Sequence, residues 1–176
     1  FRDFVLHLTA LLQRSGHEVR VIFSIGMLVR MPFTPLQFDR LVLDVPTWRQ
    51  VIGPVKATVE TNGFEFRLAV PWEDYAVSQV LAIAGLWLSE LVLDLAHEGY
   101  LYDLKLTPGY WDALRGWLQD HGHYEDLLGE KGPDHRFPLD FVDTGIEADF
   151  LYQQYEMAKA AEDPGYCLGE VGGAGG

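Results

Sequence analysis

The chain of 176 residues has little cysteine, few basic side chains and no long uninterrupted apolar run. Its one cysteine, Cys167, has no second cysteine with which to pair, so nothing indicates a disulfide-stabilised secreted fold. The most apolar stretch, around Leu86, is interrupted by Gln79, Glu90 and Asp94. Charges inside a lipid bilayer are costly, so this stretch is not predicted to cross a membrane. We therefore expect a cytoplasmic protein.

Basic residues are scarce mainly in the C-terminal third. The chain has 13 Lys and Arg against 26 Asp and Glu, a formal net charge of −13. Residues 1–116 hold 13 acids and 10 bases, whereas residues 117–176 hold 13 acids and 3 bases. Phosphate backbones and anionic lipids would repel this charge, which argues against direct nucleic-acid or membrane binding. A protein with a basic surface is the partner that the charge favours, although solubility alone would also account for it.

Familiar catalytic motifs are lacking as well. The sequence has no Gly-x-Ser-x-Gly nucleophile elbow and no His-Glu-x-x-His metal motif. Cys167 lies next to a glycine-rich C-terminal end, which is a poor place to preorganise a nucleophile. The sequence therefore favours a non-enzymatic protein over an enzyme.

Apolar residues, by contrast, make up 48% of the chain and aromatic residues 13%. This content is sufficient for a hydrophobic core and argues against disorder. At this length we predict a single α+β domain over residues 1–168. Residues 169–176 have almost nothing to bury and are predicted to be a flexible Gly-rich tail.

The expected sheet is antiparallel and is built on a β-hairpin at about 55–70. Two runs of alternating apolar residues, Val55–Glu60 and Phe64–Val70, flank the dipeptide Asn62-Gly63. Asn-Gly between two such runs is a strong hairpin signal, because both turn residues must accept positive φ. Glu18–Phe23 and Phe38–Val45 are predicted to be further strands.

A central buried helix at about 75–97 is predicted to pack against this sheet. Its apolar residues recur at three- and four-residue steps: Val77, Val80, Leu81, Ala84, Leu88, Leu91, Val92 and Leu95. Similar spacing predicts a helix over residues 1–14 and flanking helices at 108–121 and 146–161.

One predicted site is a divalent metal centre. The spacing places Glu90, Asp94 and His97 on neighbouring turns of one helix face, and His121 and His123 follow a later helix. Carboxylates and imidazoles are the ligands that Zn, Mn, Fe and Ni accept, so a small metal-dependent hydrolase is one alternative function. The other interpretation needs no metal, because His97 and His121 would then stabilise helix C-termini and the carboxylates would be solvated.

The leading hypothesis is a non-enzymatic interaction or assembly protein without a cofactor, which docks on a basic protein surface. Aromatic residues beside carboxylates suit a partner rich in Arg and Lys, through cation–π and charge pairing. The predicted contacts are Trp117, Tyr124, Glu125, Asp126, Tyr152 and Tyr155. A subunit of a larger complex or virion, or a homo-oligomer, would fit. An acidic nucleic-acid mimic that inhibits a DNA- or RNA-binding protein is a further alternative.

Overall fold

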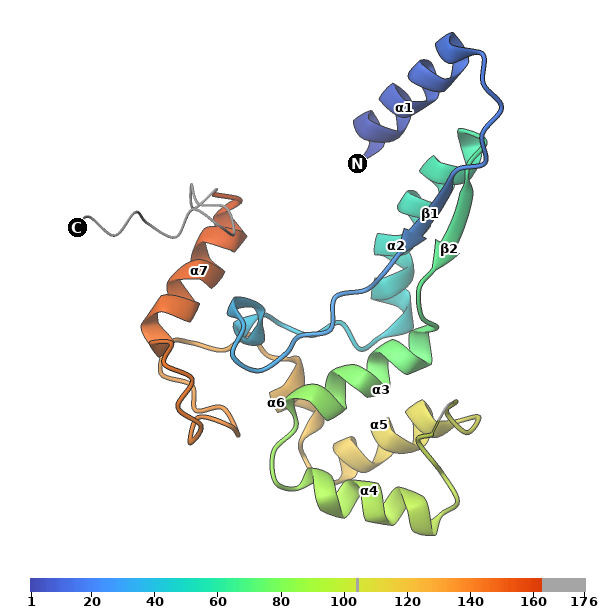
Figure 1. Ribbon diagram of the computed structural model, residues 1–176. Coiled ribbons are helices and arrows are strands. Elements are labelled where there is room, and N and C mark those ends of the chain that lie inside the picture. The colour runs from blue at the N-terminus through green and yellow to red at the C-terminus, as the bar shows by residue number, and fades with distance from the viewer. Residues whose placement is uncertain (104, 163–176) are drawn as a thin grey trace, which may run out of the picture.

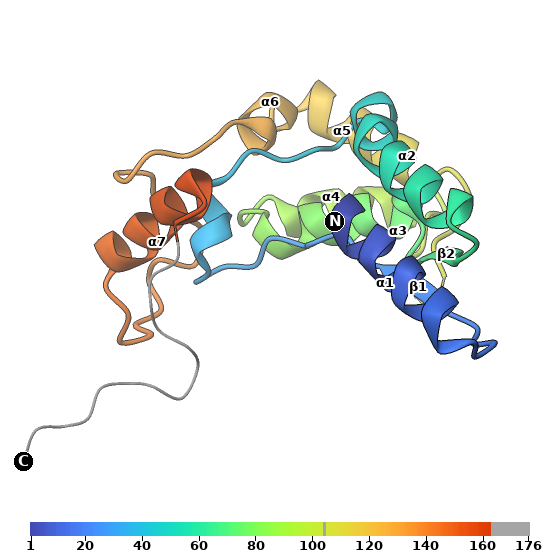
Figure 2. The ribbon, with the colours of Figure 1, turned by 90° about the horizontal axis from the view of Figure 1, so that it is seen from above.

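The computed structural model describes residues 1–103 and 105–162, which contain seven α-helices, one 3-10 helix and one two-stranded sheet (Figures 1 and 2). The helices are α1 (Arg2–Ser15), η1 (Pro35–Phe38), α2 (Val45–Thr61), α3 (Trp72–Ile83), α4 (Leu88–His97), α5 (Tyr110–Asp120), α6 (Tyr124–Leu128) and α7 (Ala148–Ala160). The strands are β1 (Ile22–Ile25) and β2 (Glu65–Leu68). The predicted tail at 169–176 lies outside the described residues.

The predicted α+β fold with an antiparallel hairpin sheet is wrong, because the first half of the hairpin at 55–70 belongs to helix α2. Asp44 caps the start of α2 by accepting a hydrogen bond from the backbone N–H of Thr47 at 2.8 Å. At its end, Gly63 has φ +80° and the N–H of Phe64 bonds to the carbonyl of Val59. The positive φ of Gly63 and the bond from Phe64 to Val59 belong to a Schellman cap at the end of α2. Glycine adopts a positive φ easily, both in such a cap and in a hairpin turn.

The observed sheet is small and parallel. Strand β2 pairs with β1 in the register Ile22↔Glu65 to Ile25↔Leu68. Helix α2 joins the two strands, as a parallel connection requires, and contacts both β2 and α1. In Figure 1 this N-terminal group of two helices and two strands extends away from α3, α4 and α5.

The predicted central helix at 75–97 is two helices, α3 and α4, separated by residues 84–87. Ala84 leaves helical geometry with ψ 154°, and Gly85 follows it. A Cβ on Gly85 would lie 3.1 Å from the indole nitrogen of Trp87, so a larger residue there would require the Trp87 side chain to shift slightly. Leu86, in the segment that separates the two helices, is 92% exposed.

The main core lies between α3, α4, α5 and α6, so residues 75–97 contribute to it as two helices and not as the predicted single helix packed against a sheet. Its buried side chains include Val77, Val80, Leu91, Leu95, Leu114, Leu118 and Leu127. The predicted helices at 1–14, 108–121 and 146–161 correspond to α1, α5 and α7. The predicted strand at 38–45 is instead extended chain after η1, from which Leu41 and Leu43 enter the core.

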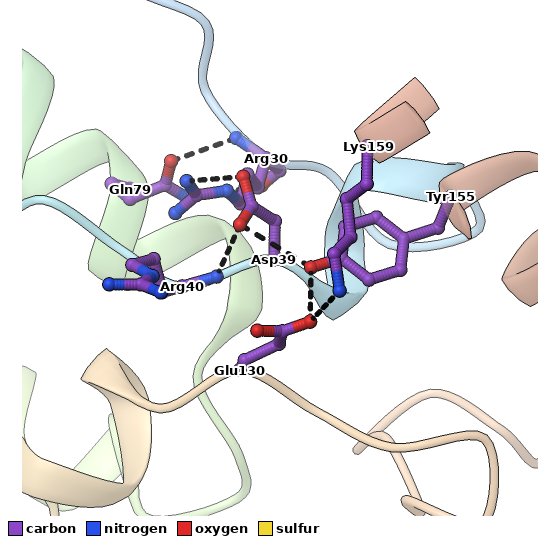
Figure 3. A network of polar contacts seen from close by, with 7 residues as sticks. All are labelled: Arg30, Asp39, Arg40, Gln79, Glu130, Tyr155 and Lys159. Carbon is purple, nitrogen blue, oxygen red and sulfur yellow. Dashed lines mark hydrogen bonds and ion pairs between the residues drawn. The ribbon is translucent and has the colours of Figure 1, made fainter. Parts of the chain in front are cut away.

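Helix α7 packs outside this core on a second, smaller cluster of Phe38, Leu151 and Tyr155. The ring of Phe38 lies 5.1 Å from the ring of Tyr152 and 6.0 Å from that of Tyr155. Polar contacts extend this attachment toward α3 (Figure 3). The first of them is formed by Gln79, a fully buried glutamine in α3.

The amide of Gln79 holds the backbone of Arg30 at two points. Its oxygen accepts the N–H of Arg30 at 2.8 Å, and its Nε2 donates to the carbonyl of Arg30 at 3.1 Å. The guanidinium of Arg30 in turn pairs with Asp39 at 3.2 Å. One side chain thus satisfies two backbone groups of an irregular segment that has no sheet partner there.

Replacing Gln79 with alanine is expected to destabilise the protein by about 2–4 kcal/mol, because two backbone groups of Arg30 lose their partners. Urea unfolding monitored by circular dichroism measures this loss. The control is Gln50→Ala on the exposed surface of α2, expected within about 0.5 kcal/mol of wild type. Equal stability of the two variants would contradict the role of Gln79.

Candidate functional site

Three of the predicted metal ligands lie on or near helix α4, but they do not act as a group. Asp94 accepts a hydrogen bond from the indole N–H of Trp117 at 2.8 Å. His97, at the end of α4, and Glu90, in its first turn, are exposed. Asp94 is therefore already engaged in joining α4 to α5.

The two other predicted ligands, His121 and His123, stack on tryptophan rings. The ring centroid of His121 lies 3.8 Å from that of Trp117, and that of His123 lies 4.3 Å from that of Trp87. The planes of each pair differ by only 11° and 12°. The Nδ1 atom of His121 also lies 2.8 Å from the backbone oxygen of Trp117. These contacts orient both imidazoles as parts of an aromatic stack.

The five predicted ligands do not converge. A hollow of about 470 Å³ between α4 and α5 is lined by Asp94, His97 and His121, but not by Glu90 or His123. Within residues 1–103 and 105–162, no three His, Cys, Asp or Glu side chains are grouped so that they could hold a metal ion. The metal-dependent hydrolase stays a prediction from sequence, without support from this arrangement.

The aromatic residues predicted to contact a partner are mostly covered. Trp117 is 9% exposed and Tyr155 1% exposed, while Tyr124 and Tyr152 are half-buried. Only the carboxylates of the predicted set, Glu125 and Asp126, are exposed.

Tyr155 and Asp126 have internal roles that the sequence did not indicate. The hydroxyl of Tyr155 donates to Glu130 at 2.8 Å, and Lys159 donates to the same oxygen at 2.6 Å (Figure 3). Burial and then the hydrogen bond to Glu130 raise the pKa of Tyr155, so its hydroxyl stays a donor. The hydrogen bond from Lys131, at 2.8 Å, lowers the pKa of Asp126.

A different surface, which the sequence reasoning missed, combines exposed apolar and acidic side chains. We call residues 139–150 the acidic strip. Its apolar members Leu139, Phe141, Val142, Ile146 and Phe150 are exposed, and Phe141 is 80% exposed. Its acidic members Asp140, Asp143, Glu147 and Asp149 are exposed too, and the strip contains no Lys or Arg. In its sequence, LDFVDTGIEADF, apolar and acidic residues alternate, and this pattern could have identified the strip.

Local hydrogen bonds shape the acidic strip before it enters α7. Asp140 accepts the N–H of Phe137 at 2.7 Å, and Asp143 accepts the N–H of Gly145 at 2.8 Å. Phe141 and Ile146 line a hollow of about 520 Å³ together with Asp140, Asp143 and Asp149. Within the described residues, no acidic side chain of the strip forms an ion pair. The strip therefore offers both apolar area and negative charge, although His135 and Arg136 also line this hollow.

Comparisons of the chain with protein-family models, with curated proteins and with solved structures gave no match. In the part of the chain that the structure describes, every helix is too short or too polar to cross a membrane. The surface and the internal contacts of the protein are therefore the features from which its function can be inferred.

The contact between Asp94 and Trp117 generates a test of the α4–α5 packing. Asp94→Ala is expected to destabilise the protein by about 1–3 kcal/mol, because the half-buried indole N–H loses its acceptor. Asp94→Asn keeps an acceptor oxygen and is expected to retain most of the stability. Thermal unfolding followed by tryptophan fluorescence compares the two variants. Equal losses would show that the hydrogen bond does not stabilise this contact.

The ion pair between Lys131 and Asp126 predicts a pH effect. Because the pKa of Asp126 is lowered by folding, its stabilising contribution is present above the ordinary value of 3.8 and is lost as pH falls through the folded pKa. Lys131→Met is expected to move the midpoint of Asp126, measured by NMR titration, up toward 3.8. Lys56→Met, which removes an exposed pair with Glu60, should leave that midpoint unchanged.

Proposed function

We propose that the protein is a non-enzymatic interaction protein that docks through the acidic strip on a partner with basic groups around an apolar groove. The observation that carries this proposal is Phe141, which is 80% exposed among acidic side chains that form no ion pair in the described chain. Aromatic anchors surrounded by polar groups are typical of the residues that dominate binding energy.

The apolar and acidic side chains of the strip would contribute in different ways. Burying an exposed phenylalanine side chain contributes about 1.5–3 kcal/mol, and Ile146 and Phe150 would add to this. The carboxylates Asp140, Asp143, Glu147 and Asp149 would instead attract a basic surface, raise the association rate and disfavour acidic partners. Affinity would thus come mainly from the apolar residues and selectivity mainly from the charges.

The attachment of α7 supports this proposal, because a docking segment that is already ordered loses less entropy on binding. The strip continues into the first turns of α7, and α7 is held by the cluster of Phe38, Leu151 and Tyr155. The ion pair of Lys159 with Glu130, at 2.6 Å, fixes the far end of α7.

The composition of the strip also makes the alternative functions less favourable than docking on a basic protein. A nucleic-acid mimic shares its negative charge, but exposed phenylalanines between the carboxylates suit an apolar groove better than a phosphate-binding surface. Two copies of the strip would repel each other, so a homo-oligomer through this face is disfavoured. The proposed partner could be a basic subunit of a larger complex or of a virion.

The test uses an 18-residue amphipathic helical peptide made of Leu and Lys, titrated into ¹⁵N-labelled protein. The expected result is chemical-shift change at residues 139–150, with binding that weakens as salt rises. Phe141→Ala is expected to weaken binding by about tenfold or more. Asp143→Asn is expected to weaken binding and to reduce the salt dependence.

Matched controls lie on α1, at the other end of the chain. Phe4 is 60% exposed, so Phe4→Ala removes a similar apolar side chain, and Asp3→Asn removes a similar exposed charge. Neither control should change the affinity. Equal weakening by Phe4→Ala and Phe141→Ala, or shifts that map outside the strip, would overturn the proposal.

A further inference from the structure

A second candidate site is an apolar hollow of about 220 Å³ beside the start of the acidic strip. The end of α3 contributes Leu81 and Ile83, and the start of α4 contributes Leu88. Phe137 and Leu139 line it from the segment that leads into the strip. A cavity of about 150 Å³ with such a lining is large enough to bind benzene, so this hollow has room for one substituted ring.

Among the described residues, no charged side chain lines this hollow, although the chain has a net charge of −13. The neighbouring hollow that includes Phe141 contains four aspartates, and the one between α4 and α5 contains Asp94, Glu98 and Asp120. Moving a charged group into an uncharged apolar hollow costs its hydration without supplying an opposite charge. The hollow therefore selects uncharged molecules.

Of the described residues that line it, Gln37 alone has a polar side chain, and it is 9% exposed. The amide oxygen of Gln37 accepts the backbone N–H of Phe33 at 2.9 Å, and this bond fixes which way the amide faces. The Nε2 group is left as a donor, and the side chain forms no other hydrogen bond within residues 1–103 and 105–162. This Nε2 group is accessible to solvent, and a donor at the edge of an apolar hollow favours a ligand that brings an acceptor to it.

We propose that this hollow binds a small, uncharged, apolar molecule of about one ring that carries a single hydrogen-bond acceptor, such as a ketone or ether oxygen. The ring occupies the space between Leu81, Leu88 and Leu139, and the acceptor takes the Nε2–H of Gln37. This site uses residues other than the exposed carboxylates and Phe141, so it does not depend on the proposed docking function.

Three probes of similar size test the chemistry: acetophenone, ethylbenzene and 1-phenylethylammonium. The expected result is that acetophenone shifts the side-chain amide signals of Gln37 and backbone signals at the end of α3 in ¹⁵N-labelled protein. Ethylbenzene, which lacks the acceptor, is expected to bind about five- to tenfold more weakly. The ammonium compound is expected to cause no shift at these residues.

Two variants and a control separate the acceptor from the cavity. Gln37→Leu is expected to abolish the preference for acetophenone over ethylbenzene, whereas Gln50→Leu on the exposed face of α2 should preserve it. Ala82→Leu enlarges a lining side chain and is expected to weaken binding of both rings. Circular dichroism verifies folding, and Ala82→Leu provides an independent test if Gln37→Leu does not fold.

Three outcomes would overturn the proposal. Equal affinity of wild type for acetophenone and ethylbenzene would refute the hydrogen bond to Gln37. Shifts confined to other parts of the chain, or affinities unchanged by Ala82→Leu, would refute the cavity. Perturbation of this hollow by the Leu/Lys peptide but by none of the small molecules would assign it to a side chain of a protein partner instead.

Discussion

The interaction on which much of the structure depends is the two-point contact between the Gln79 amide and the backbone of Arg30. It holds an irregular segment against α3 where no strand of the described residues pairs with it. Arg30 then pairs with Asp39, whose other oxygen lies 3.5 Å from the hydroxyl of Tyr155 (Figure 3). Polar contacts thus run from the main core to α7 through buried or half-buried groups, where an unpaired partner would be costly.

This dependence follows from a core that covers only the middle of the chain. The main core lies between α3, α4, α5 and α6, and α7 has only a small cluster with η1. Polar contacts therefore supplement apolar packing at α7, as Tyr155, Glu130 and Lys159 illustrate. The residues at this edge of the core, including Phe141, stay exposed because no element of the described chain folds over them.

The sequence predicted individual helices better than it predicted which segments pair with one another. The 3.6-residue spacing identified α1, α5 and α7, whose apolar faces are local properties. The hairpin prediction from Asn62-Gly63 was wrong because a glycine with positive φ occurs in helix caps as well as in hairpin turns. Only tertiary contacts decide which of the two forms. Burial of Trp117 and Tyr155 was equally hidden, because exposure depends on neighbours distant in sequence. The acidic strip could have been predicted from its alternating residues, whereas the hollow beside Gln37 could be found only in the structure.

The two proposed sites meet at Leu139, which lines the uncharged hollow and is also the first residue of the acidic strip. A molecule held in the hollow would therefore contact a residue of the strip. The neutral and acidic parts of this surface would differ in ligand chemistry but share one ordered segment.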